Sequence, residues 1–201
     1  MSRLTIAGAT CALWLAASPA AAEPFQSFVD MCLDTNADRQ AAISVAKAAG
    51  WYSMTPDVLD MESDELQETT LHLSVDPAQI GDKGPSADVE MLVTGWAGEA
   101  WDIGVDGVRM DACAIGAPFG DAAALRAQLE QRLGVPSVDM DGQRAWAFTR
   151  EGARFRSQAN FFKLGDEEAL RTLAAGKLYM AVVLPEDDVV VIMLATFRPG
   201  G

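Results

Sequence analysis

The sequence predicts an α+β fold: an antiparallel sheet of three β-hairpins with helices packed on one face, preceded by a small N-terminal helical segment. Short turns separate pairs of strand-like segments, which favours antiparallel neighbours. Helix-like segments with one apolar side lie between these pairs, and such helices cover a sheet face. Half of the 201 residues are hydrophobic and 22% are charged, a composition typical of a globular protein.

The first 22 residues have the pattern of a cleavable bacterial secretory signal peptide. Arg3 supplies a basic start, residues 4–17 are uncharged and mostly apolar, and small residues precede the expected cut before Glu23. The apolar stretch is shorter than the roughly 20 residues that a membrane span requires. We therefore expect residues 23–201 to form a single domain in the periplasm or outside the cell. An uncleaved anchor, a buried core helix and a lipoprotein are the alternatives for this segment.

Cleavage of the leader would leave two cysteines, Cys32 and Cys113, because Cys11 departs with residues 1–22. An even number of cysteines in an oxidising compartment predicts a disulfide between them. The bond would join the N-terminal helical segment to a central strand, and two buried free thiols are the alternative. The wide spacing differs from a CxxC motif, which argues against a thiol-redox catalyst.

The N-terminal part of the mature chain, residues 23–75, is predicted to be mainly helical. Apolar residues at helical spacing predict one helix over 25–33 and a second over 37–49. Thr35 or Asn36 is expected to cap the second helix, because both side chains accept hydrogen bonds from first-turn amides.

A third helix and a strand are predicted in the rest of residues 23–75. Thr55 followed by a proline predicts the start of a third helix. Residues 69–75 alternate between apolar and polar, which predicts a half-buried strand. His72, the only histidine, falls on the polar side of that strand, so we expect it to face solvent. Residues 76–88 contain two prolines and two glycines and are predicted to form a loop.

The longer C-terminal part, residues 89–201, is predicted to alternate hairpins with helices in a repeat-like order. After a strand over 89–96, the hairpins are expected at 100–105 with 108–115, 144–150 with 153–162, and 178–184 with 189–197. The helices between them are expected at 122–133 and 165–175. The last hairpin is apolar on both faces, so it should lie centrally in the sheet.

Charge and residue types weigh against several classes of function. The formal charge of −14 becomes one unit more negative without Arg3, and so acidic a surface repels nucleic acid and anionic lipid. A single histidine excludes a zinc site built from several histidines, and no GxSxG motif or phosphate-binding glycine loop is present. We therefore expect no metal and no cofactor. Paired carboxylates, or His72 with a serine, are the enzymatic alternative.

The hairpin over 144–162 holds the candidate binding site. A turn at Glu151 and Gly152 would pair Phe148 with Phe155 on an aromatic face. The other face would carry a polar strip over small residues, formed by Arg154, Arg156, Gln158 and Asn160. Because guanidinium groups offer forked donors to carboxylate or phosphate, we interpret this strip as an anion-binding or partner-docking surface. The alternative is an exposed sheet face whose arginines pair with nearby acids.

Together these observations predict an exported periplasmic protein, not an enzyme, that binds a partner or supports an assembly in the cell envelope. The expected partner is a protein, with no nucleic acid and no stable membrane span after cleavage. One alternative is a hydrolytic enzyme that uses carboxylates or His72. Another is a binder of small ligands or anions that uses Arg154 and Arg156. Trp96 and Trp101 flank a short turn, so one of them could be exposed for ligand contact.

Overall fold

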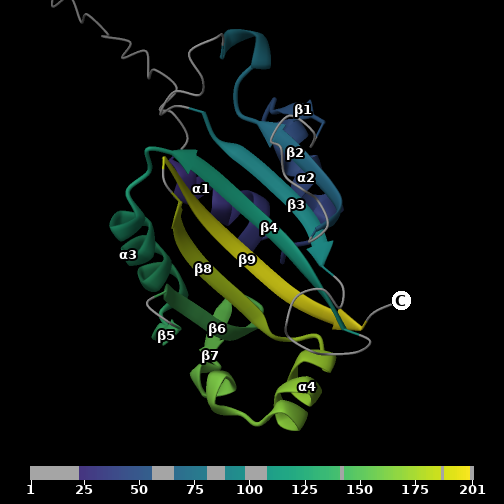
Figure 1. The fold of residues 1–201 in the computed structure, drawn as a ribbon, viewed down its shortest axis with the longest axis vertical. Coiled ribbons are helices and arrows are strands. Elements are labelled where there is room, and N and C mark those ends of the chain that lie inside the picture. Colours follow the sequence, from purple (N-terminus) through teal and green to yellow (C-terminus); the bar gives the residue numbers. More distant parts are fainter. Residues whose placement is uncertain are drawn as a thin grey trace, which may run out of the picture.

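The structure is a computed structural model that describes residues 23–55, 66–80, 89–97, 108–140, 143–186 and 188–199. Within these ranges nine strands form one antiparallel sheet accompanied by helices, which confirms the α+β class (Figure 1). The strand order is β1-β2-β3-β4-β9-β8-β6-β5, and β7 pairs with β6. The predicted leader, the predicted helix that follows Thr55 and the predicted strand over 100–105 lie outside the described residues.

The bounds of the elements are as follows. The strands are β1 (Tyr52–Met54), β2 (Gln67–Leu73), β3 (Met91–Ala97), β4 (Val108–Pro118), β5 (Val138–Met140), β6 (Gln143–Glu151), β7 (Arg154–Ser157), β8 (Tyr179–Glu186) and β9 (Val189–Pro199). The α-helices are α1 (Pro24–Phe28), α2 (Arg39–Ala48), α3 (Ala122–Leu133) and α4 (Asp166–Ala174). A π-helical segment, η1 (Val29–Leu33), continues α1, and two 3-10 segments are η3 (Pro77–Gln79) and η5 (Ala159–Lys163).

The N-terminal helices form where the sequence predicts them, but the second has a different cap. Asp38 caps α2, because its carboxylate accepts a hydrogen bond of 2.9 Å from the amide of Ala41. The predicted cap at Thr35 or Asn36 is therefore wrong. Asn36 and Ala37 instead take left-handed φ values of 58° and 55°, which turn the chain between η1 and α2.

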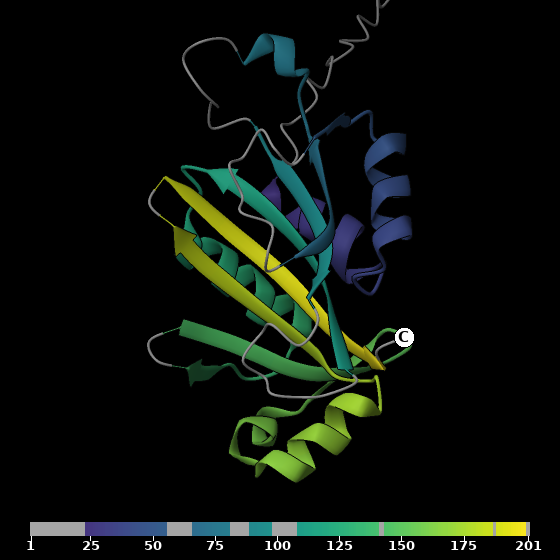
Figure 2. The same cartoon turned by 45° about the vertical axis from the view of Figure 1, so that its right-hand side comes forward.

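Helices lie on both faces of the sheet, which corrects the expectation that they cover one face. The segments α1, η1, α2 and α3 pack against Cys113 and its neighbours in the largest core cluster. Leu173 of α4 belongs to a second cluster that includes Ala112 and Ala195. Successive residues of a strand point to opposite faces, so α4 packs on the face opposite the other helices (Figures 1 and 2). The central strands are apolar on both sides and therefore need cover on both.

The predicted disulfide between Cys32 and Cys113 is confirmed. Cys32 lies in η1 and Cys113 in the middle of β4, with Cα atoms 5.4 Å apart and 81 positions between them in sequence. Both side chains are fully buried in the largest core cluster. The bond ties the N-terminal helical segment to a central strand, as predicted.

Two predicted hairpins are found among the described residues. β8 pairs with β9 and both strands lie inside the sheet, so the central placement of the last hairpin is confirmed. β6 pairs with β7, but Glu151 is opposite Arg154, so the turn lies at Gly152 and Ala153, one residue later than predicted. Gly152 has a φ of 60°, a left-handed conformation that glycine adopts without steric cost.

The strand predicted over 153–162 ends early. β7 stops at Ser157, and the amide of Gln158 donates a hydrogen bond of 2.8 Å to the carbonyl of Ala147. The chain then turns into η5, where Phe161 and Phe162 pack against the cluster of α4. Both rings are partly buried there, on the side of the sheet that α4 covers.

Candidate functional site

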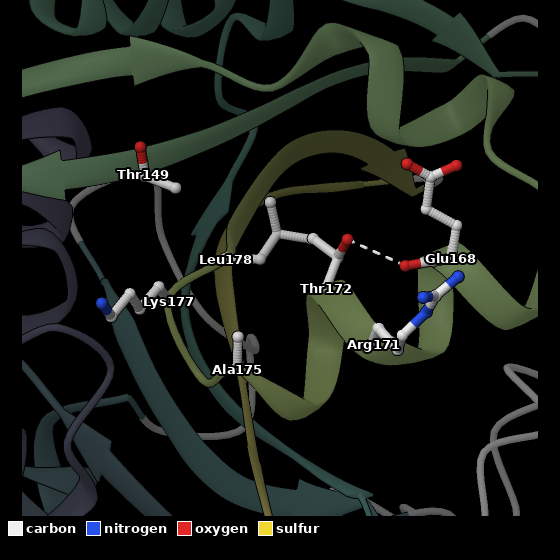
Figure 3. A pocket seen from close by; sticks show the side chains of 7 residues that line it. All are labelled: Thr149, Glu168, Arg171, Thr172, Ala175, Lys177 and Leu178. Atoms are coloured by element: carbon white, nitrogen blue, oxygen red, sulfur yellow. Dashed lines mark hydrogen bonds between the residues drawn. The ribbon is translucent and has the colours of Figure 1, made fainter.

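A groove of about 480 Å³ lies between α4 and β6 (Figure 3). Thr149 of β6 lies on one side of it and the polar residues of α4 on the other. Leu178, which is 1% exposed, supplies an apolar surface in the groove. The complete lining is Thr149, Glu168, Arg171, Thr172, Ala175, Lys177 and Leu178.

The predicted arginine strip adjoins this groove. Thr149, in the groove wall, is paired directly with Arg156 of β7. Directly paired residues on one face have Cβ atoms about 4.5–5.5 Å apart. Ala147, two residues before Thr149 and on the same face, packs with Leu173 of α4 in one cluster. The strip and α4 therefore lie on the same face of the sheet, and Arg156 stands at the edge of the groove.

The four predicted site residues do not form one continuous strip. Arg154 and Arg156 are exposed on β7. Gln158 follows the strand, and its Nε2 donates to the hydroxyl of Thr149 across 3.4 Å. Asn160 lies in η5, off the sheet, because the chain turns after Ser157. The structure therefore brings three of the four residues to the groove side of the hairpin.

The aromatic face of the hairpin forms with a shifted register. Phe148 is opposite Ser157, and Phe155 is opposite Arg150, so the two rings are not directly paired as predicted. They share a face and meet edge to face, with centroids 5.4 Å apart. The shift of the turn by one residue accounts for the difference and leaves the division into two faces intact.

Cations outnumber carboxylates along the groove. Its lining includes Arg171 and Lys177 against the single carboxylate of Glu168. Arg156 pairs with Glu151 at 2.8 Å, but both side chains are about 60% exposed, where an ion pair contributes little free energy. Within the described ranges neither Arg154 nor Lys177 has an ion-pair partner. Arg154 and Lys177 therefore remain available to an anionic ligand, whereas Arg171 lies 3.8 Å from Glu167 in another exposed ion pair.

Sequence patterns did not identify Arg171 and Lys177 as site residues. Both flank the end of α4, and they reach the groove only because α4 packs on the same face as Thr149. That face is set by the second apolar cluster, which joins residues far apart in the chain. A helix start and stop can be predicted locally, but the face on which the helix packs cannot.

His72 is buried, which corrects the expectation of a solvent-facing residue. It is 2% exposed because it shares a sheet face with Leu92, its direct partner on β3, and Leu92 packs in the cluster of α1 and α2. Burial lowers the pKa of His72, and the positive charge of Lys47 lowers it further. Among the described residues neither ring nitrogen has a hydrogen-bond partner.

The arrangement around His72 lacks the contact that activates a serine. The buried hydroxyl of Ser27 donates to the carboxylate of Glu90 rather than to the imidazole. A nucleophile of this class needs a hydrogen bond to its base. Burial raises the pKa of Glu90, and the bond from Ser27 partly opposes that rise.

Two further observations on the part of the chain that the structure describes concern metal ligands and membrane-spanning helices. No group of three or more His, Cys, Asp or Glu side chains there could hold a metal ion. No described helix is long and apolar enough to cross a membrane.

Comparison with known proteins identifies no relative of this chain. No model of a protein family matches it, and neither a curated protein nor a solved structure matches it. The geometry and charge of the groove therefore carry the functional interpretation.

Proposed function

We propose that this protein has a binding role and holds an acidic segment of a partner protein in the groove between α4 and β6. The observation that carries the proposal is the register of the hairpin, which pairs Thr149 of the groove wall with Arg156. That pairing sets Arg156 beside Thr149 on one side of the groove, while Arg171 of α4 lies on the other; Lys177, which follows α4, also lines the groove. Carboxylates of a bound segment would meet cations from both sides, and guanidinium groups bind carboxylates through two donors.

The character of the groove favours an extended peptide over a deeply enclosed small molecule. Its volume is within the roughly 300–1,000 Å³ of typical ligand sites. The side chains of Arg171 and Arg156 are 72% and 64% exposed, so the groove is open to a large partner. Because the whole chain has a net charge of −14, only a local concentration of cations can hold an acidic partner.

We infer that this binding takes place in the periplasm or outside the cell, after removal of residues 1–22. The pattern of those residues supports export. The disulfide between Cys32 and Cys113 supports it as well, since disulfides form and persist in oxidising compartments. Intact-mass analysis of the protein from its native host should find a chain that begins at Glu23 and has no free thiol. A retained Met1, or two free thiols, would contradict the inference.

Fluorescence anisotropy with a labelled ten-residue glutamate-rich peptide tests the binding role. The wild-type protein should bind this peptide at low ionic strength and lose affinity as salt is added. A lysine-rich peptide of equal length should bind elsewhere or not at all. The triple variant R154Q/R156Q/K177Q should bind the acidic peptide at least ten times more weakly, which corresponds to about 1.4 kcal/mol.

Arg144 supplies a matched control. It is exposed on β6, but it has the same strand parity as Trp146 and therefore lies on the face opposite the groove. R144Q and R156Q each remove one positive charge from the same hairpin. R156Q should weaken peptide binding two- to fivefold, as is typical of a rim charge, and R144Q should leave it unchanged. Equal effects of the two variants would show that net charge, not the groove, governs binding.

A further inference from the structure

A second, smaller pocket lies at the end of the sheet where β3 and β9 finish and β4 begins. Its volume is about 160 Å³, below the range of drug-sized sites, so it suits a molecule of few atoms. The wall combines Trp96 of β3 with charged side chains of β4, β9, the first turn of α2 and the bulge of β2. The lining is Asp38, Arg39, Gln40, Glu68, Gly95, Trp96, Arg109, Asp111 and Arg198. None of these residues lines the groove described above.

Asp111 organises the cationic side of the pocket. Its side chain is 10% exposed, and both of its oxygens face an arginine. Nε of Arg109 lies 3.0 Å from Oδ1, and Nε of Arg198 lies 2.7 Å from Oδ2. Arg109 and Arg198 are direct cross-strand partners on β4 and β9, so Asp111 holds two adjacent guanidinium groups. One buried carboxylate thus lies in ion-pair contact with two cations, although Nε of Arg109 has no hydrogen-bond partner among the described residues.

The outer parts of these guanidinium groups are partly exposed and can reach a ligand. The contacts printed between these side chains and Asp111 are made by the Nε atoms. Nη2 of Arg198 also lies 4.0 Å from Oδ2 of Asp38, at the outer limit of an ion pair. Both side chains are about 40% exposed, and Arg109 also stacks over the ring of Trp96. Donors that are fixed before binding lose little entropy when a carboxylate arrives.

Two further carboxylates, those of Glu68 and Asp38, line the pocket. Glu68 contacts Arg39 at the start of α2, and its backbone has a φ of 50°, a left-handed conformation that is costly for a residue with a Cβ. The register of β2 against β3 shifts between Gln67 and Thr70, so Glu68 sits on a bulge. Bulges redirect side chains, and here the bulge brings a carboxylate to the pocket. Asp38, the cap of α2, adds a second.

From this arrangement we infer that the pocket binds a small zwitterion, a molecule with one carboxylate and one ammonium group such as an α-amino acid. Arg109 and Arg198 would hold the carboxylate, and Glu68 with Asp38 would hold the ammonium group. The pocket has three arginines and three acids, so it has no net charge to attract a simple anion or cation. The net charge of −14 on the whole chain further disfavours a free anion, whereas a neutral zwitterion escapes that repulsion.

Binding of three matched probes tests this assignment on the mature protein. Glycine has both charges, propionate has the carboxylate alone, and ethylammonium has the cation alone. Two-dimensional ¹H–¹⁵N NMR should show that glycine shifts the indole resonance of Trp96 and the Nε resonances of Arg109 and Arg198. Propionate and ethylammonium should bind at least ten times more weakly. Equal binding of propionate and glycine, or no shift with 50 mM glycine, would overturn the inference.

Two variants test the carboxylate contacts and the ammonium contacts of the pocket separately. R198K keeps the positive charge but loses the forked donors, and it should weaken glycine binding at least tenfold, whereas the control R144K should not. E68Q removes one contact for the ammonium group, so it should weaken glycine binding and strengthen that of propionate. Unchanged affinity for both probes in E68Q would contradict the assignment. Circular dichroism and an intact disulfide confirm that each variant is folded. The acidic peptide should still bind R198K, so failure here is distinguishable from failure of the groove proposal.

Discussion

Nη1 of Arg150 donates a hydrogen bond of 2.6 Å to the backbone carbonyl of Leu33, which joins β6 to the last residue of η1. The same guanidinium contacts Asn36 at 3.1 Å and Asp34 at 3.4 Å, and its Nε donates to the carbonyl of Gly152. A helix end has carbonyls without partners inside the helix, and Arg150 supplies donors for this one. The contact connects segments more than 110 positions apart in sequence.

Replacing Arg150 with alanine should destabilise the fold by about 2 kcal/mol, because hydrogen bonds to charged groups contribute about 1.5–3 kcal/mol each. The side chain is 22% exposed, so solvent weakens part of this effect. Urea unfolding followed by fluorescence measures the change. R154A, an exposed arginine on the neighbouring strand without an ion-pair partner in the described ranges, should change stability by less than about 0.5 kcal/mol. Similar losses in the two variants would argue against a structural role for the Arg150 contacts.

Reduction of the Cys32–Cys113 disulfide should cost about 2–4 kcal/mol, because the closed loop is long and restricts the unfolded chain. The double variant C32S/C113S should show a comparable loss in urea unfolding. Reducing agent should shift the midpoint of the wild-type protein but not that of the double variant. If the oxidised and reduced wild-type proteins unfold at the same urea concentration, the bond does not stabilise this fold.

Local sequence patterns predicted much of the secondary structure, and the cysteine count predicted the disulfide between the N-terminal segment and the sheet. The predicted helix over 122–133 matches α3, which Gly134 ends with a left-handed φ of 62°. The pairing of β8 with β9 followed from two strand-like segments joined by a short turn, and their central place followed from apolar residues on both faces. The disulfide followed from the number of cysteines and the expected compartment. Each of these features depends on residue types and spacing within a short stretch or on a simple count.

Sequence patterns did not predict the features that depend on packing between distant segments. His72 alternates with apolar neighbours exactly as a solvent-facing strand residue would, yet helices cover its side of the sheet. The groove needs α4 to pack beside Thr149, and the smaller pocket needs Arg109 and Arg198 to be cross-strand partners. The pattern of residues within one strand does not identify the strand that will pair with it. The arginine strip was identified because its members are close in sequence, whereas Arg171 and Lys177 are not part of that hairpin.

Glu90 should limit the stability of the folded protein at neutral pH. Burial raises its pKa above the ordinary value of 4.5, so the folded state binds a proton more readily than the unfolded state. Stability from this group is therefore present at low pH and is lost as pH rises through the pKa of the folded state. E90Q keeps an acceptor for the hydroxyl of Ser27 without the buried charge. The variant should be more stable than the wild type at pH 7 and equally stable near pH 4. Urea unfolding at the two pH values measures this, and a less stable E90Q at pH 7 would contradict it.

His72 should have the opposite effect on the pH dependence of stability. Its pKa in the folded state lies below the ordinary value of 6.5, because burial and Lys47 disfavour the protonated ring. The unfolded chain then binds the proton more readily, so stability is complete above about pH 6.5 and decreases as pH falls toward the pKa of the folded state. H72L removes both unpaired nitrogens, and it should stabilise the protein by about 1 kcal/mol at pH 7.

Comparison of E90Q with the double variant H72L/E90Q isolates the contribution of His72 to the pH dependence of stability, because both variants lack the carboxyl group of Glu90. Stability of E90Q should fall between pH 6.5 and pH 5, and the double variant should lose less over the same range. The protein has one histidine, so a single pair of imidazole resonances in the NMR spectrum reports its titration directly. Those resonances should shift with a midpoint below 6.5. A midpoint at or above 6.5, with equal pH profiles for the two variants, would show that the folded protein accommodates a charged His72.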